Sequence, residues 1–191
     1  MYFVAINCFW NRNKDYYKSS DWKGTKTLDG GTLFTQFSHF VDILYYLFGD
    51  IKDIQGKTLN ASHSGLIEFE DSGTFTFKLI NNGLGSLNYT TCSYNKNMEG
   101  SILVFSENGT IKIGGQYLNT IDYDSSNWGD LNIKDGSSKP NDYGSYKGSM
   151  SNHDKVIDNV INTLNGRSEI MTNAMDGLKV VNIIERVYNS A

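Results

Sequence analysis

The sequence predicts an α+β fold: one large, mostly antiparallel β-sheet with helices packed on one face. The first indication is the order of elements, which runs strand, helix, many strands and then two helices. The second is a set of turn signals between short strand-like runs, such as Asn81-Asn82-Gly83 and Glu107-Asn108-Gly109. Strands joined by tight turns must pair antiparallel, and the alternation Thr74-Phe75-Thr76-Phe77 indicates a sheet with one covered face.

Composition excludes several classes of partner. The net charge is −4 and both signs are spread along the chain, whereas nucleic acid or an anionic membrane requires clustered Lys and Arg. No apolar run is long enough to span a bilayer, and the start lacks the features of a secretion signal. Cys8 and Cys92 lie far apart without metal-ligand spacing. We expect two buried free thiols, no metal, and a location in the reducing cytoplasm.

The first elements are a buried strand over Tyr2–Phe9 and a loop over Trp10–Gly24. The loop mixes aromatic residues with basic ones, including Arg12, and shows no clean period apart from a short helical turn. Aromatic and cationic groups on a loop can hold a polar, anionic ligand. A surface loop whose aromatic side chains only pack is an equal alternative.

The segment Thr32–Phe48 is predicted to be a single helix with two distinct faces. Its core stripe consists of Leu33, Phe37, Phe40, Leu44, Leu47 and Phe48, and its polar line of Thr35, His39, Asp42 and Tyr46. Gly30 and Gly31 before it allow a sharp turn and a close approach to another molecule. The imidazole of His39 can exchange a proton near neutral pH. A solvent-facing histidine without a role explains the periodicity at least as well.

The remaining chain is predicted to continue the sheet and end in two helices. The expected strands are Ile51–Ala61, Gly65–Glu70, Thr74–Ile80, Leu84–Cys92, Gly100–Phe105, Thr110–Ile113 and Tyr117–Tyr123, with a turn at Asp71-Ser72-Gly73. Asp124–Met150 is predicted to be a long loop. One helix should begin at Ser151–Asp154 and end before Gly166. The last helix, Met175–Asn189, should turn these side chains inward: Leu178, Val181, Ile184, Val187 and Tyr188.

Several ordered motifs resemble the C-terminal domain of the Gfo/Idh/MocA oxidoreductases. They are Trp22-Lys23-Gly24-Thr25, Leu28-Asp29-Gly30-Gly31, Gln36, Ser38-His39-Phe40-Val41-Asp42, Glu99-Gly100-Ser101-Ile102, Glu107-Asn108-Gly109-Thr110 and Asp176-Gly177-Leu178-Lys179. The likeness covers nearly the whole chain. Within the family it is strongest to the 3-dehydrogenases of UDP-N-acetylglucosaminuronic acid, enzymes of O-antigen sugar biosynthesis. The resemblance implies a glyceraldehyde-3-phosphate dehydrogenase-like C-terminal domain.

The resemblance also implies a reaction and a set of site residues. Family members oxidise a sugar carbon by hydride transfer to NAD or NADP, which an N-terminal Rossmann domain binds. His39 matches the family's histidine and would take part in the proton transfer. Many members carry Asp four residues before it, where this chain has Thr35, so a hydroxyl-binding role is expected there. Gln36 would hydrogen-bond the sugar, and Arg12 and Tyr17 would meet a carboxylate or pyrophosphate.

The chain departs from the family pattern in what it lacks. It contains neither a Gly-x-Gly-x-x-Gly loop nor a Glu-Lys-Pro motif, and it starts where the family's second domain starts. We therefore expect residues 1–191 to be a substrate-binding and oligomerisation domain that is inactive alone. A homo-oligomer formed through the sheet is expected, because an uncovered apolar face would otherwise stay wet. The alternatives are a non-catalytic assembly domain and a carbohydrate-binding β domain.

Overall fold

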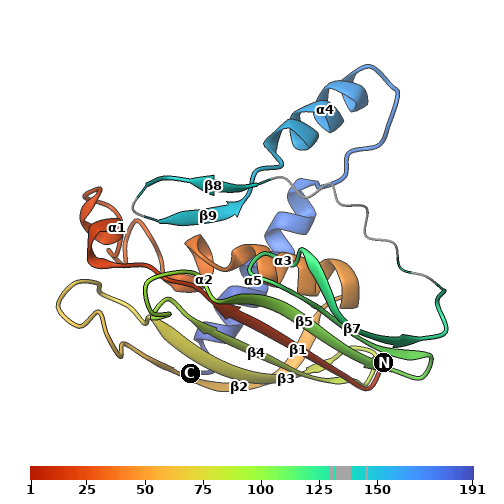
Figure 1. Ribbon diagram of the computed structural model, residues 1–191, viewed down its shortest axis with the longest axis horizontal. Helices are drawn as coiled ribbons and strands as arrows, with labels where there is room; N and C mark the ends of the chain where they lie inside the picture. Colours follow the sequence, from red (N-terminus) through yellow and green to blue (C-terminus); the bar gives the residue numbers. More distant parts are fainter. Residues whose placement is uncertain (130, 132–138, 145) are drawn as a thin grey trace.

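The computed structural model describes residues 1–129, 131, 139–144 and 146–191. A seven-stranded sheet dominates it, with strand order β2-β3-β4-β1-β5-β6-β7 (Figure 1). The strands are β1 (Phe3–Phe9), β2 (Ile51–Leu59), β3 (Ser72–Leu79), β4 (Leu84–Thr90), β5 (Glu99–Ser106), β6 (Gly109–Gly114) and β7 (Thr120–Ser126). Neighbouring strands pair antiparallel except β1 and β4, which are parallel. The predicted α+β architecture is confirmed.

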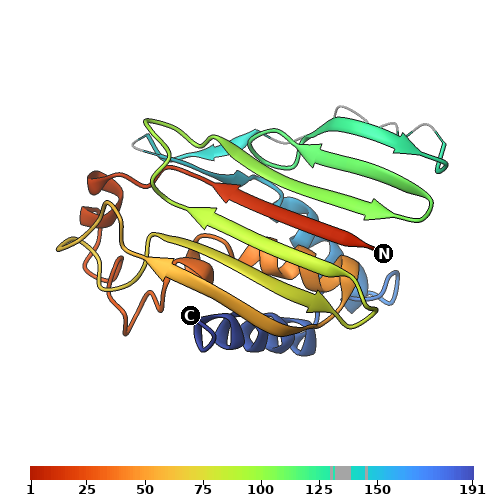
Figure 2. The same ribbon diagram turned by 90° about the horizontal axis from the view of Figure 1, so that it is seen from below.

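Three helices cover one face of this sheet: α2 (Thr32–Thr35), α3 (Ser38–Phe48) and α5 (Ala174–Tyr188). None of the described elements covers the opposite face (Figure 2). Strand periodicity places alternate side chains of β1 under the helices, where Val4, Ile6 and Cys8 are fully buried. They join one apolar core with Phe37 and Leu44 from above.

The predicted helix Thr32–Phe48 is interrupted at Gln36 and Phe37. The amide of Phe37 donates to the carbonyl of Thr32 at 3.2 Å, one residue beyond the α-helical pattern. Contacts from distant elements fix both sides of the break. The amide of Leu33 donates to the hydroxyl of Tyr188 at 2.8 Å, and the side chain of Gln36 is drawn toward Arg12. Both pieces keep one apolar face, which is why periodicity predicts a single helix, although Leu47 is half exposed.

The segment Gly65–Glu70 is not a strand, so the predicted turn at Asp71-Ser72-Gly73 is also wrong. β2 and β3 pair directly instead, and residues 60–71 form a loop between them. Side chains replace the expected ladder: the Asn60 amide donates to the carbonyls of Ile67 and Phe69 at 3.4 and 2.9 Å.

Another correction concerns the predicted loop Asp124–Met150, which contains a hairpin of β8 (Pro140–Asp142) and β9 (Lys147–Met150). Residues 130, 132–138 and 145 of this segment lie outside the described residues. The last strand of the sheet begins at Thr120, three residues later than predicted.

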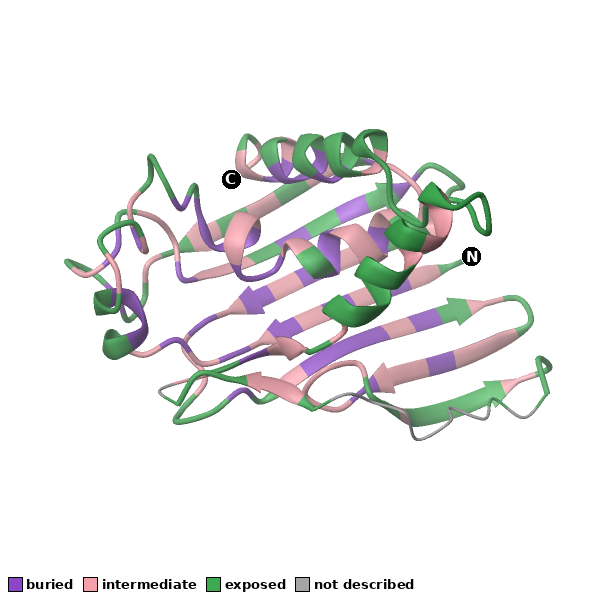
Figure 3. Ribbon diagram, turned by 90° about the horizontal axis from the view of Figure 1, so that it is seen from above, coloured by how far each residue is buried: buried purple, intermediate pink, exposed green. Residues whose placement is uncertain are grey.

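The two C-terminal helices expose more apolar surface than predicted. α4 (His153–Leu164) buries no residue, and its turns are mostly exposed in Figure 3. It projects away from the sheet in Figure 1. α5 turns Val180, Ile183, Ile184 and Val187 inward against α3 and β2, while Leu178 and Val181 are 57% and 43% exposed. The predicted inward set was therefore wrong for these two residues. None of the described helices is long and apolar enough to cross a bilayer.

The two faces of α5 should differ in energetic importance. Ile184→Ala removes a side chain that is 1% exposed and should lower the free energy of unfolding by about 2–5 kcal/mol. Leu178→Ala, on the exposed face of the same helix, should change it by about 0.5 kcal/mol or less. Denaturant unfolding of the two variants measures this. Equal losses would contradict the placement of α5.

Candidate functional site

The site is built around Arg12, which follows β1 and is 3% exposed. Its Nε donates to Oε1 of Gln36 at 2.5 Å, and Nη1 donates to the carbonyl of Asn11 at 2.7 Å. Nη1 also reaches Oδ1 of Asn97 and the carbonyl of Lys147, both at 3.4 Å. Burial lowers the pKa of the guanidinium, although neighbouring tyrosines oppose the shift. In the described part of the chain, no carboxylate forms an ion pair with Arg12.

Aromatic rings supply part of the missing compensation. The guanidinium carbon lies 5.2, 5.2 and 5.1 Å from the ring centroids of Trp10, Tyr16 and Tyr146. The negative π-face of such a ring attracts a cation, and most strongly where water is excluded. Tyr16 belongs to the short helix α1 (Lys14–Lys18), which Asn13 caps by accepting the amide of Tyr16 at 2.9 Å.

Gln36 links this cation to the helix that carries His39. It occupies the break between α2 and α3, and its amide nitrogen donates to the hydroxyl of Tyr16. Burial raises the pKa of Tyr16, so this residue stays a neutral phenol. The structure thus brings together the predicted residues Arg12 and Gln36, and adds Tyr16 as their partner.

Thr35 donates its hydroxyl proton to Oδ1 of Asp29. The other carboxylate oxygen of Asp29 accepts the amide of Gly24 at 2.7 Å. A carboxylate therefore lies beside position 35, although it comes from the preceding turn and not from the helix. With its proton donated to Asp29, the Thr35 oxygen is left as an acceptor for a ligand hydroxyl.

His39 is exposed on α3 and lines a cavity of about 370 Å³. The other walls are largely apolar and include Trp10, Phe40, Tyr117 and Met150. His153, at the start of α4, faces the same cavity. Desolvation by these neighbours lowers the pKa of His39, with Asp42 opposing and His153 adding to the shift. The imidazole is therefore neutral near pH 7 and able to accept a proton.

Tyr17 points to a different group of residues from Tyr16. Its hydroxyl lies 3.5 Å from Oγ1 of Thr91, and its ring packs edge-on against His63 with the centroids 5.2 Å apart. Burial raises the pKa of Tyr17 far above its ordinary value. None of the contacts described for this side chain reaches Gln36 or His39.

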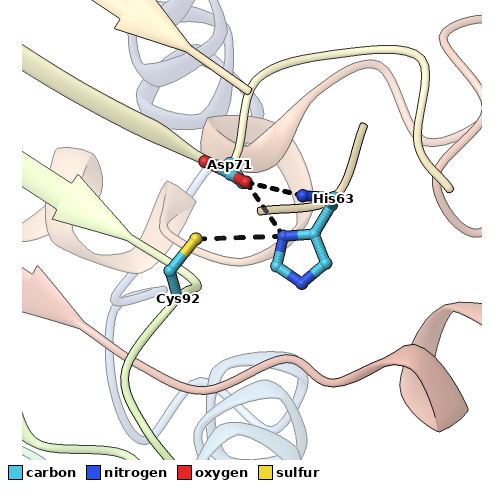
Figure 4. A group of neighbouring side chains, drawn as sticks. All are labelled: His63, Asp71 and Cys92. Atoms are coloured by element: carbon cyan, nitrogen blue, oxygen red, sulfur yellow. Dashed lines mark hydrogen bonds and ion pairs between the residues drawn. The ribbon is translucent and has the colours of Figure 1, made fainter. Parts of the chain in front are cut away.

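His63 is buried in a cluster with Asp71 and Cys92 (Figure 4). Nδ1 lies 3.0 Å from Oδ2 of Asp71, and Nε2 lies 2.8 Å from the carbonyl of Arg12. The two ring nitrogens thus join Asp71 to the backbone of Arg12, which fastens the 60–71 loop beside the site.

The same three side chains resemble a metal site, because their ligand atoms lie within 4.8 Å of one another. Their hydrogen bonds argue against this. Asp71 already accepts the amides of Ala61, Ser62 and His63 and the hydroxyl of Ser72, between 2.7 and 3.1 Å. Burial and the nearby carboxylate raise the pKa of Cys92, which keeps it a thiol and not the thiolate that binds metal. The hydrogen bonds of Asp71 therefore account for the cluster without a metal ion.

Sequence reasoning missed several residues of this site. They are Tyr16, Asn97 and Tyr146 around Arg12, and Lys23, whose Nζ lies 4.3 Å from the ring centroid of Tyr16. The contacts of Arg12 with Asn97 and with the Lys147 carbonyl span 85 and 135 residues of sequence, and no local pattern announces them. Lys23 had a visible signal, because it lies inside the motif Trp22-Lys23-Gly24-Thr25.

A broad, mostly antiparallel sheet covered by helices on one face defines the class of this protein as an α+β domain, and His39 lies beside a cavity on the covered side. All of residues 1–191 match the family described as oxidoreductase family, C-terminal alpha/beta domain. The chain therefore belongs to the Gfo/Idh/MocA oxidoreductases and forms their C-terminal domain, as its motifs indicated. No curated protein matches the sequence.

Solved structures place the chain more closely. It is 32% identical to the WlbA dehydrogenase of Bordetella pertussis and 34% identical to that of Chromobacterium violaceum, each with a TM-score of 0.82. Both were crystallised with NADH and UDP-GlcNAcA. The match covers 100% of this chain but 51% and 52% of theirs, so the chain spans about half their length. An oxidoreductase from Agrobacterium radiobacter shares the fold at 16% identity and a TM-score of 0.71, over 100% of this chain and 54% of its own.

The hydrogen bonds of Asp71 should make the free energy of unfolding fall at acid pH, and this fall is the acid limb of the stability profile. Burial alone would raise the pKa of Asp71, but its hydrogen bonds outweigh this and lower it from 3.8 to about 2. The stability that it contributes is complete above about pH 4 and is lost as the pH falls toward 2. Asp71→Asn should cost about 3–5 kcal/mol at pH 7 and flatten that acid limb.

The matched control is Asp53→Asn, which removes an exposed carboxylate paired with Lys78 at 3.0 Å. Its effect should stay within about 1 kcal/mol. Denaturant unfolding from pH 2 to pH 7 compares the two variants. An unchanged acid limb in Asp71→Asn would show that the hydrogen bonds of Asp71 contribute little to stability.

Proposed function

We propose that this chain is the substrate-binding, catalytic-histidine domain of an NAD(P)-dependent sugar or nucleotide-sugar dehydrogenase. The observation that carries the proposal is the neutral imidazole of His39 beside an aromatic-lined cavity. It gains weight from two matches above 30% identity, over all of this chain and about half of each partner, to dehydrogenases crystallised with NADH and UDP-GlcNAcA. Surface-polysaccharide sugar biosynthesis in the cytoplasm is the corresponding setting.

The chemistry assigned to this chain is proton transfer and orientation. A bound NAD(P) would supply the hydride acceptor. His39 removes the proton of the reacting sugar hydroxyl as the carbon loses its hydride, and its lowered pKa keeps it unprotonated for this task. Thr35, with its own proton donated to Asp29, accepts a hydrogen bond from a neighbouring sugar hydroxyl. Trp10 and Phe40 exclude water from the cavity wall.

The other predicted residues hold the polar end of the substrate site. Arg12 provides the fixed positive charge, and Gln36 orients it by accepting its Nε–H at 2.5 Å. No described residue accepts the second amide N–H of Gln36, so this is the group that we assign to the sugar. Tyr17 is assigned to the wall near His63, where it supports Arg12 through the loop and the backbone.

We infer that a nucleotide-binding domain covers α4. This helix exposes an apolar stripe of Val156, Ile157, Val160, Ile161 and Leu164, each between 41% and 82% exposed. The occupant that we propose corresponds to the part of the WlbA dehydrogenases that this chain does not match, which is about half of their length. An amphipathic helix without a partner otherwise leaves apolar area in water. Without that domain, the chain should not turn over.

We also propose a homo-oligomer formed through the uncovered sheet face (Figure 2). A polar row crosses this face, in which Thr74 bonds Asn88 at 2.7 Å, Asn88 bonds Asn7 at 3.1 Å, and Asn7 bonds Ser101 at 3.2 Å. Because these groups satisfy one another, they can be covered by a second sheet without losing hydrogen bonds.

The test of catalysis uses a longer polypeptide that joins this chain to its nucleotide-binding domain. It should reduce NAD with UDP-GlcNAcA, and His39→Ala should lower the rate about 10²–10⁴-fold. The rate should also fall as the pH drops through a pKa below 6.5, and the variant should lack this limb. Tyr46→Ala, an exposed change on the same helix, is the control. Full activity in His39→Ala would favour a non-catalytic assembly domain.

The test of the α4 interface compares the double variant Ile157→Gln/Ile161→Gln in two contexts. In the 191-residue chain these exposed side chains should alter the free energy of unfolding by about 0.5 kcal/mol or less. In the longer polypeptide the same change should loosen the domain contact, which limited proteolysis between the domains would detect. Equal protease resistance of variant and parent would contradict the interface.

A further inference from the structure

The turn between β6 and β7 places Tyr117 in the wall of the cavity that His39 lines. The ring of Tyr117 packs against that of Trp10, with the centroids 6.0 Å apart. The preceding residue, Gln116, accepts the indole N–H of Trp10 at 3.3 Å and donates its side-chain amide to the carbonyl of Asn97 at 2.9 Å. Tyr117 is therefore held on a braced turn, which is the kind of support that a side chain acting on a ligand needs.

The side chain of Asn97, which is 4% exposed, holds the hydroxyl of Tyr117. Oδ1 accepts the backbone amide of Asn11 at 2.9 Å and Nη1 of Arg12 at 3.4 Å, and both of these groups can only donate. Nδ2 donates to the carbonyl of Lys147 at 3.1 Å, which can only accept, and to the hydroxyl of Tyr117 at 3.2 Å. These partners determine which end of the amide is the nitrogen, so the oxygen of Tyr117 is an acceptor in this contact.

The phenol of Tyr117 consequently keeps its own proton for another partner. A hydroxyl that accepts one hydrogen bond still has an O–H to donate, and Nδ2 of Asn97 cannot accept it. Within the described part of the chain, no residue accepts this O–H. Tyr117 therefore offers a donor to a ligand in the cavity beside His39.

The proposed reaction needs such a donor. Neutral His39 accepts the proton of the reacting hydroxyl, and Thr35 accepts a proton from a neighbouring one. Neither group stabilises the negative charge that grows on the reacting oxygen as its proton leaves. A donor already in place at that oxygen, in a cavity whose aromatic walls exclude water, stabilises the transition state more than the bound substrate.

We propose that Tyr117 is a second catalytic residue, which donates its phenol O–H to the oxygen on the reacting sugar carbon, and that Asn97 is its positioning residue. This inference rests on the proposed function and adds a residue to it. The hydroxyl proton passes to His39, the hydride leaves the carbon for bound NAD(P), and the oxygen becomes that of a ketone. Tyr117 keeps its proton throughout, so the step is balanced without any further reactant.

The first experiment measures Tyr117→Phe in the longer polypeptide that joins this chain to its nucleotide-binding domain, with UDP-GlcNAcA and NAD. Phenylalanine keeps the ring beside Trp10 and removes only the donor. The kcat should fall about 10²–10³-fold, while KM changes by less than about threefold. The fall in rate at acid pH should remain, because His39 is intact. Tyr94→Phe, at a tyrosine that is 88% exposed, is the matched control and should keep full activity.

The second experiment tests the positioning role with Asn97→Asp, which has nearly the same shape. The new carboxylate accepts from Asn11 and Arg12 as the amide oxygen does, but it also accepts the O–H of Tyr117 and so withdraws the donor from the ligand. The kcat should fall nearly as far as in Tyr117→Phe, and the double variant should be no slower than Tyr117→Phe. Additive losses would overturn the positioning role.

The outcomes separate failure of this inference from failure of the proposed function. Unfolding curves establish that each variant is folded. Full activity in Tyr117→Phe, a rise in KM alone, or loss of the fall in rate at acid pH overturns the catalytic role of Tyr117 while the dehydrogenase stands. No reduction of NAD by the wild-type polypeptide with UDP-GlcNAcA overturns the proposed function, and the role of Tyr117 with it.

Discussion

Two adjacent carboxylates, Glu70 and Asp71, hold the domain together at the start of β3. Oε1 of Glu70 accepts the amide of Thr32 at 3.2 Å and the hydroxyls of Tyr89 and Tyr188 at 3.1 and 2.7 Å. It thereby joins α2, the sheet and the end of α5. Asp71 serves the other side, where it gathers the loop amides and His63. Burying a carboxylate costs free energy, and the hydrogen bonds from these donors offset that cost.

This anchoring determines the shape of the site. Tyr188 approaches the backbone so closely that a Cβ on Gly31 would lie 2.5 Å from its hydroxyl, and Gly31 adopts a φ of +136°. The start of α2 is therefore fixed, and α3 must restart after Gln36. The break directs Gln36 toward Arg12, while His39 lines the cavity together with Trp10. The break at Gln36 and Phe37 thus separates the side chain that contacts Arg12 from the imidazole at the cavity.

Patterns local in sequence predicted the architecture and the helix of His39, because burial of one face imposes a period that survives even a broken helix. They failed where contacts between residues far apart in the sequence determine the local structure. Asn60 and Asp71 take over the hydrogen bonds of a segment whose composition favours a strand. Arg12 and Gln36 were predicted separately, but their contact, and the tyrosines around it, depend on tertiary packing. The exposed face of α5 was also not predicted, because its apolar residues Leu178 and Val181 fit a helical period as well as the buried ones do.

The central position of β1 has a consequence for biosynthesis. Phe3 pairs with Leu84 on one side and with Phe105 on the other, so the middle of the sheet is its earliest segment. During translation this apolar strand stays unpaired until its neighbours β4 and β5 have left the ribosome. Folding must then form contacts between distant parts of the chain, which is slow and leaves unpaired strand edges open to aggregation.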